Sequence, residues 1–383
     1  MFITQVFLSF FRIRRKLRPD LPLITHQVDL WKSDAPFVSI IIPCYNHGRY
    51  VDDAVQSILE QTWQNLEIII VNDGSIEKET MDILKDFHRP RTRVLHLSQN
   101  MGLPAARNAG IKVSKGKYIC CLDADDKIQS TYIEKSIITM EINAGISFIW
   151  AWNQVFGDED RVWYTQQFDA YNMLFWPYLT APAVFRKTAW ELSGGFREEM
   201  REGFEDWEFW IRLIGNGFRG YRISEKLIFI RRIGQSFVHK ALAIRDFLFS
   251  KIKEYNPGIY TDPKSFINKI EDSYSDIYSS SPFVNFKDRS SYLQMNTAPH
   301  MVISDLNAES TIASLKHRNT SSPLIWVAKQ PMDEEALDLL YKTTPYVYVL
   351  PNFLPSYARY EFIQNLKKIW KIHSVERLNR FSL

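Results

Sequence analysis

Three carboxylates within four positions follow an apolar run in this sequence. Residues 118–122 read YICCL, and Asp123, Asp125 and Asp126 come directly after them. Like charges at the end of a buried strand repel one another unless a cation lies beside them. Because side chains alternate along an extended chain, Asp123 and Asp125 are expected to point the same way and Asp126 elsewhere. Such a pair suits Mg²⁺ or Mn²⁺ shared with a diphosphate, although these aspartates could instead cap the following helix.

Two further polar clusters follow other apolar segments. Asp73 ends the run LEIIIVND and is followed by Gly74 and Ser75, which is either a plain turn or a carboxylate that accepts an N–H from a nucleobase. Tyr45, in the segment PCYN, could stack against such a base. Arg107, in GLPAARNAG, is expected either to face a phosphate near a helix N-terminus or to pair with an aspartate of the acidic cluster.

The elements that must position these groups alternate regularly. Residues 37–42, 66–71, 93–97 and 117–122 are strand-like, and apolar residues at helical spacing separate them, as in YVDDAVQSILEQ. This order predicts an α/β fold with a mostly parallel, doubly wound sheet and right-handed crossovers. Ligands bind at the carboxyl ends of the strands in such sheets, and the clusters at 43–46, 72–75, 100–102 and 123–126 all fall there.

The motifs together resemble family 2 glycosyltransferases of the GT-A fold. They occur in the family's order as VSIIIPCYNHGRYVDDAVQSILEQT, LEIIIVNDGS, NMGLPAARNAGI, GKYICCLDADD, SGGF and EDWEFWIRL, over residues 36–239. The resemblance implies an enzyme that transfers a hexose with inversion from a nucleotide-sugar, usually a UDP-sugar, using Mn²⁺ or Mg²⁺.

The resemblance also implies roles for individual residues. Asp206 matches the catalytic base, and Glu205 precedes it. The implied contacts to the donor are Pro43, Tyr45, Asn46, Asp73, Arg107 and Asp123. The implied metal ligands are Asp125, Asp123 and His239, and Arg232 is the other candidate for the further contact to metal or diphosphate that the family supplies after the base. An amphipathic helix with Asp206 near its N-terminus would explain the same stretch structurally, and Trp207 and Trp210 are either core residues or the floor of an acceptor site.

Composition narrows the class of protein. Of the 383 residues, 45% are hydrophobic and 24% charged, as in ordinary globular proteins, and a net charge of +3 is too small to indicate nucleic acid binding. The three cysteines, Cys44, Cys120 and Cys121, have neither a disulfide pattern nor metal-ligand spacing, which favours a reducing cytoplasm. No run approaches the roughly 20 apolar residues of a membrane span, and the Gln-x-x-Arg-Trp motif of processive members is missing. A single-addition enzyme therefore fits better.

Four segments are expected along the chain. Residues 1–34 are aromatic and then basic, which suits a helix on an anionic lipid surface at the inner face of the plasma membrane, or a terminus packed on a neighbouring domain. Residues 35–240 are expected to form the GT-A domain and 241–297 a helical and linker region. Residues 298–383 predict a small α/β module that resembles the truncated, non-catalytic start of a GT-B glycosyltransferase.

The expected function is transfer to a hydroxyl of a glycan or lipid-linked acceptor in cell-surface polysaccharide synthesis. A catalytically inactive scaffold of a membrane-associated glycan assembly is one alternative. The pattern in YICCLDADDK also resembles phosphatases of the haloacid-dehalogenase type, which need a hydroxyl-bearing residue shortly after the second aspartate. Asp126 and Lys127 stand there instead, and a phosphatase would leave the VNDGS and EDWEFW motifs unexplained.

Overall fold

The structure is a computed structural model that describes residues 38–234, 237–273, 300–305, 310, 324–354, 356–370, 372 and 374–378. The expected membrane-surface segment at 1–34 lies outside these residues, and so do residues 274–297 of the expected helical and linker region at 241–297. None of the helices in the described ranges has the length and apolar character that crossing a membrane requires.

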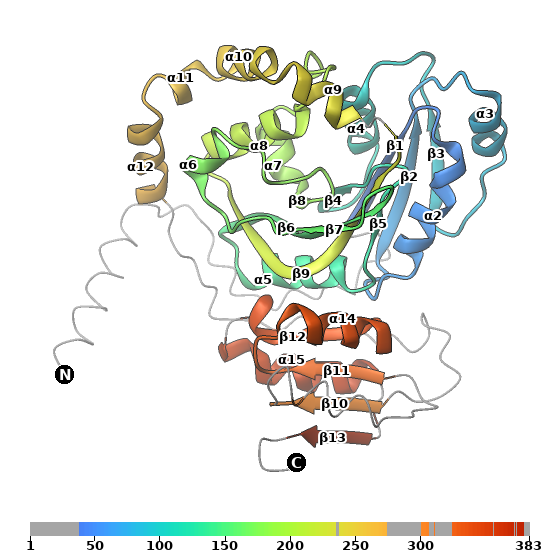
Figure 1. The fold of residues 1–383 in the computed structure, drawn as a ribbon, viewed down its shortest axis with the longest axis vertical. Helices are drawn as coiled ribbons and strands as arrows, with labels where there is room; N and C mark the ends of the chain where they lie inside the picture. The colour runs from blue at the N-terminus through green and yellow to red at the C-terminus, as the bar shows by residue number, and fades with distance from the viewer. Residues whose placement is uncertain are drawn as a thin grey trace.

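Nine strands form one large sheet in the order β3-β2-β1-β4-β8-β6-β9-β5, with β7 paired to β6 (Figure 1). The strands are β1 (Val38–Cys44), β2 (Leu66–Asn72), β3 (Thr92–His96), β4 (Tyr118–Cys121), β5 (Lys127–Ile128), β6 (Ile146–Gly157), β7 (Arg161–Trp163), β8 (Val184–Arg186) and β9 (Arg219–Arg232). The helices between and after them are α2 (Gly48–Leu59), α3 (Lys78–Lys85), α4 (Leu103–Lys112), α5 (Tyr132–Ile142), α6 (Ala170–Met173), α7 (Lys187–Leu192), α8 (Glu205–Gly215), α9 (Phe237–Ala243), α10 (Arg245–Tyr255), α11 (Pro257–Tyr260) and α12 (Pro263–Ser273).

The first half of the sheet is parallel and doubly wound, as the sequence predicts. Strands β1 and β2 are buried along their whole length, because their β-branched residues are covered on both faces by crossover helices. Strand β1 pairs in parallel with both β2 and β4, so the chain reverses its winding between β1 and β4. In the second half β8 runs antiparallel to both β4 and β6, whereas β6 and β9 are again parallel.

Helices cover both faces of the large sheet. Apolar residues of α2 and α5 pack in one core with alternate residues of β1, while α4 and α8 pack with the intervening residues in a second core. The polar strand ends are therefore left at an edge between the two helical layers. This arrangement confirms the α/β class and fixes where a site can form.

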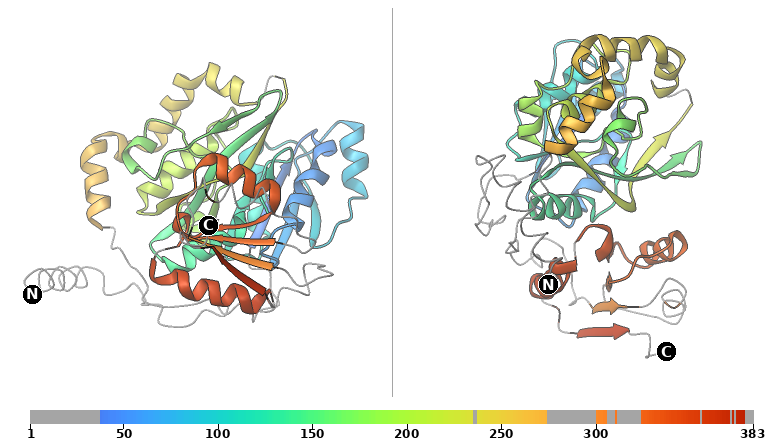
Figure 2. Two further views of the ribbon diagram at one scale, coloured as in Figure 1. Left: turned by 60° about the horizontal axis from the view of Figure 1, so that its bottom comes forward. Right: turned by 90° about the vertical axis from the view of Figure 1, so that its left-hand side faces the viewer.

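A second, smaller sheet of four parallel strands has the order β12-β11-β10-β13 (Figure 1), and Figure 2 shows its orange and red elements from two further sides. Its elements are β10 (His300–Ser304), β11 (Leu324–Ala328), α14 (Glu334–Thr343), β12 (Tyr346–Val349), η1 (Leu350–Asn352), α15 (Ser356–Ile369) and β13 (Ser374–Leu378). We call these elements the C-terminal module. The module confirms the expected α/β character of this region, whereas its resemblance to a GT-B glycosyltransferase stays a prediction.

Helix α5 lies between the large sheet and the C-terminal module (Figure 1). Ten of its eleven residues are buried, because the sheet covers one side and the module the other. Apolar residues of α5 share one continuous core with module residues such as Tyr348, Phe353 and Phe362. The charged residues Glu134 and Lys135 are consequently enclosed in this interface.

The packing of α4 on the sheet allows a test of the fold. A Cβ atom on Gly110 would lie 2.4 Å from Ile41 Cγ2 and 2.9 Å from Val71 Cγ2. We expect Gly110→Ala to lower the free energy of unfolding by about 1–3 kcal/mol through overpacking, measured by urea denaturation. The matched control is Gly258→Ala, where no atom lies within 4 Å of the added Cβ. Equal stability of the two variants would contradict the close approach of α4 to β1 and β2.

Candidate active site

Asn46 ties together the loops that follow β1 and β2. Its backbone adopts a left-handed conformation with φ 58°, which asparagine tolerates better than most residues. Its side-chain oxygen accepts the N–H groups of Ile76 and Glu77 at 2.9 and 3.1 Å, and its own N–H donates to Ser75 Oγ. Asn46 therefore shapes the site, whereas Tyr45 beside it is 40% exposed and free to meet a ligand. Pro43 is buried within β1.

Asp73 anchors the loop that begins α4. Its two carboxylate oxygens accept the N–H groups of Met101 at 2.7 Å and Gly102 at 2.9 Å. Burial raises the pKa of Asp73, although both backbone hydrogen bonds act in the opposite direction. The structure thus gives Asp73 a supporting role, and each oxygen keeps a second lone pair for a ligand.

Arg107 joins the acidic loop to α8. Its guanidinium donates to Asp123 Oδ1 at 2.9 Å and to Glu205 Oε1 at 2.5 Å, and the side chain is only 1% exposed. Of the two expectations for Arg107, the ion pair with an aspartate of the cluster is therefore the one that the structure supports. Asp123 is 36% exposed, so its second oxygen can still face a ligand.

Basic side chains lie near the other aspartates of the loop. His47 Nδ1 lies 3.8 Å from Asp125 Oδ2. Burial and the neighbouring charge of Asp123 raise the pKa of Asp125. A raised pKa is expected for a buried carboxylate that lacks a close cationic partner. Asp126 is buried and turned away, as the alternation predicts, and its Oδ1 accepts the N–H of Arg231 at 2.8 Å.

Arg231 is a site residue that the sequence did not reveal. Besides its backbone bond to Asp126, its side chain donates to the carbonyl oxygen of Asp125 at 3.0 Å and pairs with Asp53 at 2.9 Å. The basic pair at the end of β9, Arg231 and Arg232, was the available signal, but sequence alone did not show that β9 ends beside the acidic loop. Arg232 bonds back to the carbonyl of Arg231.

Asp206 stands at the N-terminus of α8, beside Glu205. The chain enters the helix through Phe204, whose φ of 57° is uncommon for an aromatic residue and marks a tight turn. Asp206 Oδ1 accepts the N–H of Trp207 at 2.7 Å. Burial and the charge of Glu205 raise the pKa of Asp206 to about 7. Since Glu205 is already paired with Arg107, Asp206 is the better placed of the two to accept a proton.

Trp207 and Trp210 belong to the core. Both are fully buried, and Trp207 donates its indole N–H to the carbonyl of Met173 at 2.6 Å. Trp210 stacks on Phe148, with 5.4 Å between the ring centroids. These contacts favour the core interpretation over an acceptor floor.

The residues at the acidic loop can hold a divalent cation only with help from a ligand. Asp123 and Asp125 offer hard oxygen donors, which is the chemistry that Mg²⁺ and Mn²⁺ prefer. Among the described residues no three His, Cys, Asp or Glu side chains converge as a metal-binding group, and His239 lies exposed on α9. A two-carboxylate site completed by diphosphate oxygens fits this donor set.

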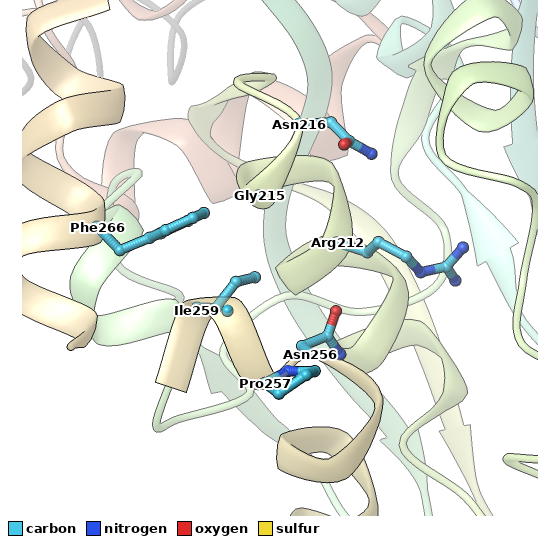
Figure 3. A pocket seen from close by; sticks show the side chains of 8 residues that line it. Arg212, Gly215, Asn216, Asn256, Pro257, Ile259 and Phe266 are labelled. Atoms are coloured by element: carbon cyan, nitrogen blue, oxygen red, sulfur yellow. The ribbon is translucent and has the colours of Figure 1, made fainter. Parts of the chain in front are cut away.

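A small pocket lies at the other end of α8 (Figure 3). Its volume is about 200 Å³, and its lining includes Arg212, Asn256 and Phe266. Arg212 is paired with Glu208 at 2.7 Å, and Asn256 donates to the carbonyl of Ile252 at 2.9 Å. Because a helix rises about 1.5 Å per residue, the part of the lining from Arg212 to Asn216 lies roughly 9–15 Å along α8 from Asp206, and the pocket is separate from the carboxylate edge.

The raised pKa of Asp206 predicts a pH-dependent stability. Between its ordinary value of 3.8 and about 7, the folded protein keeps a proton that the unfolded chain loses, so stability falls as pH rises through this range. Asp206→Asn removes the charge of this partly buried carboxylate. We expect its melting temperature in metal-free buffer to exceed that of the wild type by about 3 °C or more at pH 8, and by less at pH 5. The exposed control Asp246→Asn should show no such trend, and a pH-independent difference for Asp206→Asn would contradict the burial argument.

Comparison with known proteins agrees with this geometry. Residues 39–206 match the family described as Glycosyl transferase family 2. The uncharacterized glycosyltransferase MJ1057 of Methanocaldococcus jannaschii is 28% identical over 51% of this chain and 70% of its own length. Glycosyltransferase GlyA of Streptococcus pneumoniae is 29% identical over 51% of this chain and 29% of its own length. TuaG of Bacillus subtilis, named for teichuronic acid biosynthesis, is 38% identical over 31% of this chain and 46% of its own length.

The structural likenesses are more distant. Staphylococcus aureus TarS 1–349, solved in complex with UDP-GlcNAc, shares 18% identity and a TM-score of 0.47 over 54% of this chain and 61% of that chain. The chain thus spans most of the length of the first relative, but less than half of GlyA and TuaG. The match to glycosyl transferase family 2 covers strands β1 to β8 and the first two residues of α8, and together with the names of the relatives it indicates a glycosyltransferase.

Proposed function

We propose that this chain transfers a sugar with inversion from a nucleotide-sugar, most simply a UDP-sugar, to a hydroxyl of a glycan or lipid-linked acceptor, one unit at a time. The family match over residues 39–206 supports the reaction class. The name of the relative TuaG supports a place in cell-surface polysaccharide synthesis. The proposed reaction uses Mn²⁺ or Mg²⁺ as the divalent cation.

One observation carries the proposal. The guanidinium of Arg107 bonds to Asp123 in the acidic loop and to Glu205 at the start of α8, at 2.9 and 2.5 Å. Asp123 and Glu205 are 82 positions apart in the chain, so this arginine joins two distant segments. A donor held at Asp123 and a base at Asp206 are therefore neighbours, as transfer between bound substrates requires.

The chemistry assigned to Asp206 is general base catalysis. The acceptor hydroxyl attacks C1 of the sugar, the bond from C1 to the diphosphate oxygen breaks, and Asp206 takes the hydroxyl proton. A base works best when its pKa is near the working pH, and the pKa of about 7 suits this role. Glu205 is held by Arg107 and would keep α8 in place.

The donor would lie across the ends of β1, β2 and β4. Tyr45 is exposed and could stack on the base, while the remaining lone pairs of Asp73 could accept an N–H of the base. Asp123 and Asp125 would hold the divalent cation, which would offset charge on the diphosphate leaving group.

Asp206→Asn is expected to lower the rate of sugar transfer by about 10² or more while donor binding persists, because the amide keeps the shape but accepts no proton. The rate would be measured by product formation and donor affinity by calorimetry. The exposed control Asp246→Asn should transfer normally. Near-normal transfer by Asp206→Asn would assign the base elsewhere, with Glu205 as the first candidate.

Asp125→Asn is expected to weaken metal-dependent binding of UDP by about tenfold or more without unfolding the protein, because the side chain is partly exposed at the loop. Calorimetry with and without Mn²⁺ measures this, and the exposed Asp82→Asn on α3 is the control. Unchanged affinity in a folded variant would remove Asp125 from the metal site.

Thermal stabilisation by UDP-, GDP- and dTDP-sugars would identify the donor, and no stabilisation by any of them would favour the scaffold alternative.

A further inference from the structure

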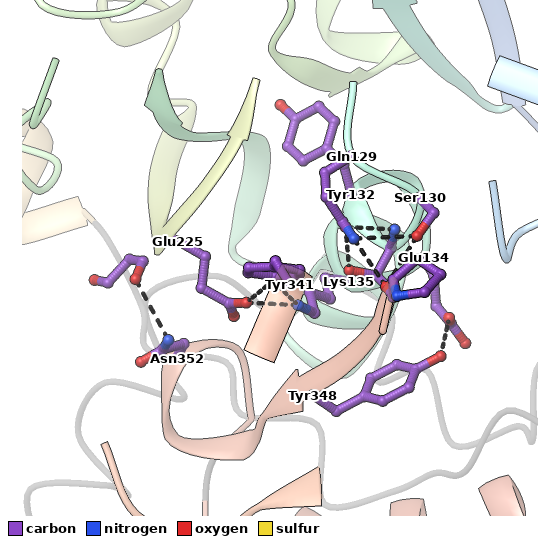
Figure 4. A network of polar contacts seen from close by, with 12 residues as sticks. Gln129, Ser130, Tyr132, Glu134, Lys135, Glu225, Tyr341, Tyr348 and Asn352 are labelled. Atoms are coloured by element: carbon purple, nitrogen blue, oxygen red, sulfur yellow. Dashed lines mark hydrogen bonds and ion pairs between the residues drawn. The ribbon is translucent and has the colours of Figure 1, made fainter. Parts of the chain in front are cut away.

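We propose that the C-terminal module is a positioning device for the acidic loop at Asp123–Asp126, holding it in the arrangement that binds metal and donor. This inference rests on the proposed function, since it assigns a role toward the same site. The module lies on the far side of the large sheet from α8, and it contributes no side chain to the carboxylate edge in the described residues. The module nevertheless contacts three segments close to the loop, which are residues 129–130 directly after it, helix α5 and strand β9 (Figure 4).

The first contact is with the segment directly after the acidic loop. Gln129 Nε2 and Ser130 Oγ both donate to the carbonyl oxygen of Pro345 in the module, at 2.8 and 3.0 Å. The oxygen of the Gln129 amide accepts from the N–H of Thr131 at 2.7 Å. Since only three residue steps separate Asp126 from Gln129, a displacement here would be felt in the loop.

The second contact is with α5, which continues from this segment. Tyr348 of the module donates its hydroxyl to Glu134 Oε2 at 2.9 Å, and the same oxygen accepts from Thr62 Oγ1 at 2.5 Å. Further along, Thr139 Oγ1 lies 3.2 Å from the carbonyl oxygen of Phe353, while its shorter hydrogen bond goes to the carbonyl of Lys135 at 2.7 Å. The beginning and the later part of α5 are therefore both in contact with the module.

The third contact is with a bulge in β9. The register of β6 against β9 moves from Ala151↔Ile223 to Trp152↔Lys226, so Ser224 and Glu225 have no partner on β6. Such a bulge turns a side chain out of the strand's regular alternation. Glu225 forms an ion pair with Lys135 of α5 at 2.7 Å, and both side chains are fully buried.

The module closes this ion pair on its other side. The hydroxyl of Tyr341 bonds to Glu225 and lies 3.2 Å from Lys135 Nζ. The ring of Tyr348 lies 5.8 Å from Lys135 Nζ, and Asn352 Nδ2 donates to the carbonyl of Ser224 at 3.4 Å. Removing the module would expose a buried charge pair and free the bulge, so β9 depends on these contacts.

The segment after the acidic loop and strand β9, which both contact the module, also pair with each other beside the loop. Strand β5, directly after Asp126, pairs with β9 through Lys127↔Phe229 and Ile128↔Ile228. Strand β9 then reaches Arg231, which bonds to both Asp125 and Asp126. The module thus fixes the two strands that frame the loop, and a residue such as Tyr341 or Tyr348 acts on the site through them rather than by touching a substrate.

The test removes only the two hydroxyl groups, in Tyr341→Phe with Tyr348→Phe in the full chain. We expect the apparent dissociation constant for Mn²⁺ in the presence of UDP to rise about 3- to 10-fold, less than the roughly 10- to 100-fold typical of outer-shell partners that bond directly to a metal ligand. Transfer at saturating Mn²⁺ should change less than 2-fold. Hydrogen exchange of the amides at 124–131 in the metal-free protein should become faster, and this readout does not require activity.

Two variants serve as control and alternative. Tyr360→Phe changes an exposed tyrosine of α15 in the same module, at 74% exposure, and should alter neither quantity. Gln129→Glu replaces the amide donor to Pro345 by a carboxylate while keeping the acceptor for Thr131, so it tests the first contact if the double variant fails to fold. It should weaken Mn²⁺ binding and speed the same exchange.

The outcomes separate this inference from the proposed function. Unchanged exchange at 124–131 in a folded variant overturns the positioning role, and so does an unchanged affinity for Mn²⁺ when the wild type binds it. A wild-type protein without metal-dependent UDP binding would contradict the proposed function. Faster exchange in the variants would then still support a positioning role for the module. A uniform loss of stability with no local change in exchange at 124–131 would contradict that role and leave the module only a contribution to overall stability.

Discussion

The ion pairs of Arg107 are the constraint on which the candidate site depends. A guanidinium that is almost wholly buried must have carboxylate partners, and Arg107 finds them in Asp123 and Glu205. Because its donors form a rigid fork, the bonds fix the distance between the acidic loop and the start of α8. Removing Arg107 would leave the buried carboxylate of Glu205 without its cation, so the arrangement of the two segments is one unit.

The same electrostatic rule explains why three aspartates can gather after one strand. Arg107 balances Asp123, Arg231 holds Asp126 through its backbone N–H, and His47 lies near Asp125 at 3.8 Å. Asp125 is less well compensated than Asp123, and burial raises its pKa. A partly compensated carboxylate beside an exposed one is the arrangement that would favour a divalent cation.

Burial on both sides of α5 joins the two parts of the described chain. The apolar core of the large sheet continues into the C-terminal module, and the polar groups trapped between them are bonded to one another. An enclosed pair such as Lys135 and Glu225 adds little net stability, but it is costly to separate. The interface therefore fixes one relative placement of the module and the sheet, which is what a positioning role requires.

The sequence by itself determined the α/β class, the parallel arrangement of the first four strands and the clusters at their ends, because buried β-branched runs and helical periodicity are local signals. It also placed Asp206 at a helix N-terminus and separated Asp126 from Asp123 and Asp125. Three features were decided only by tertiary structure, since each joins segments far apart in the chain. These are the choice of Arg107 between phosphate and aspartate, the position of Arg231 beside the acidic loop, and the burial of α5 by the module. Pairing of this kind depends on which strands become neighbours, and a local pattern of residues carries no information about that.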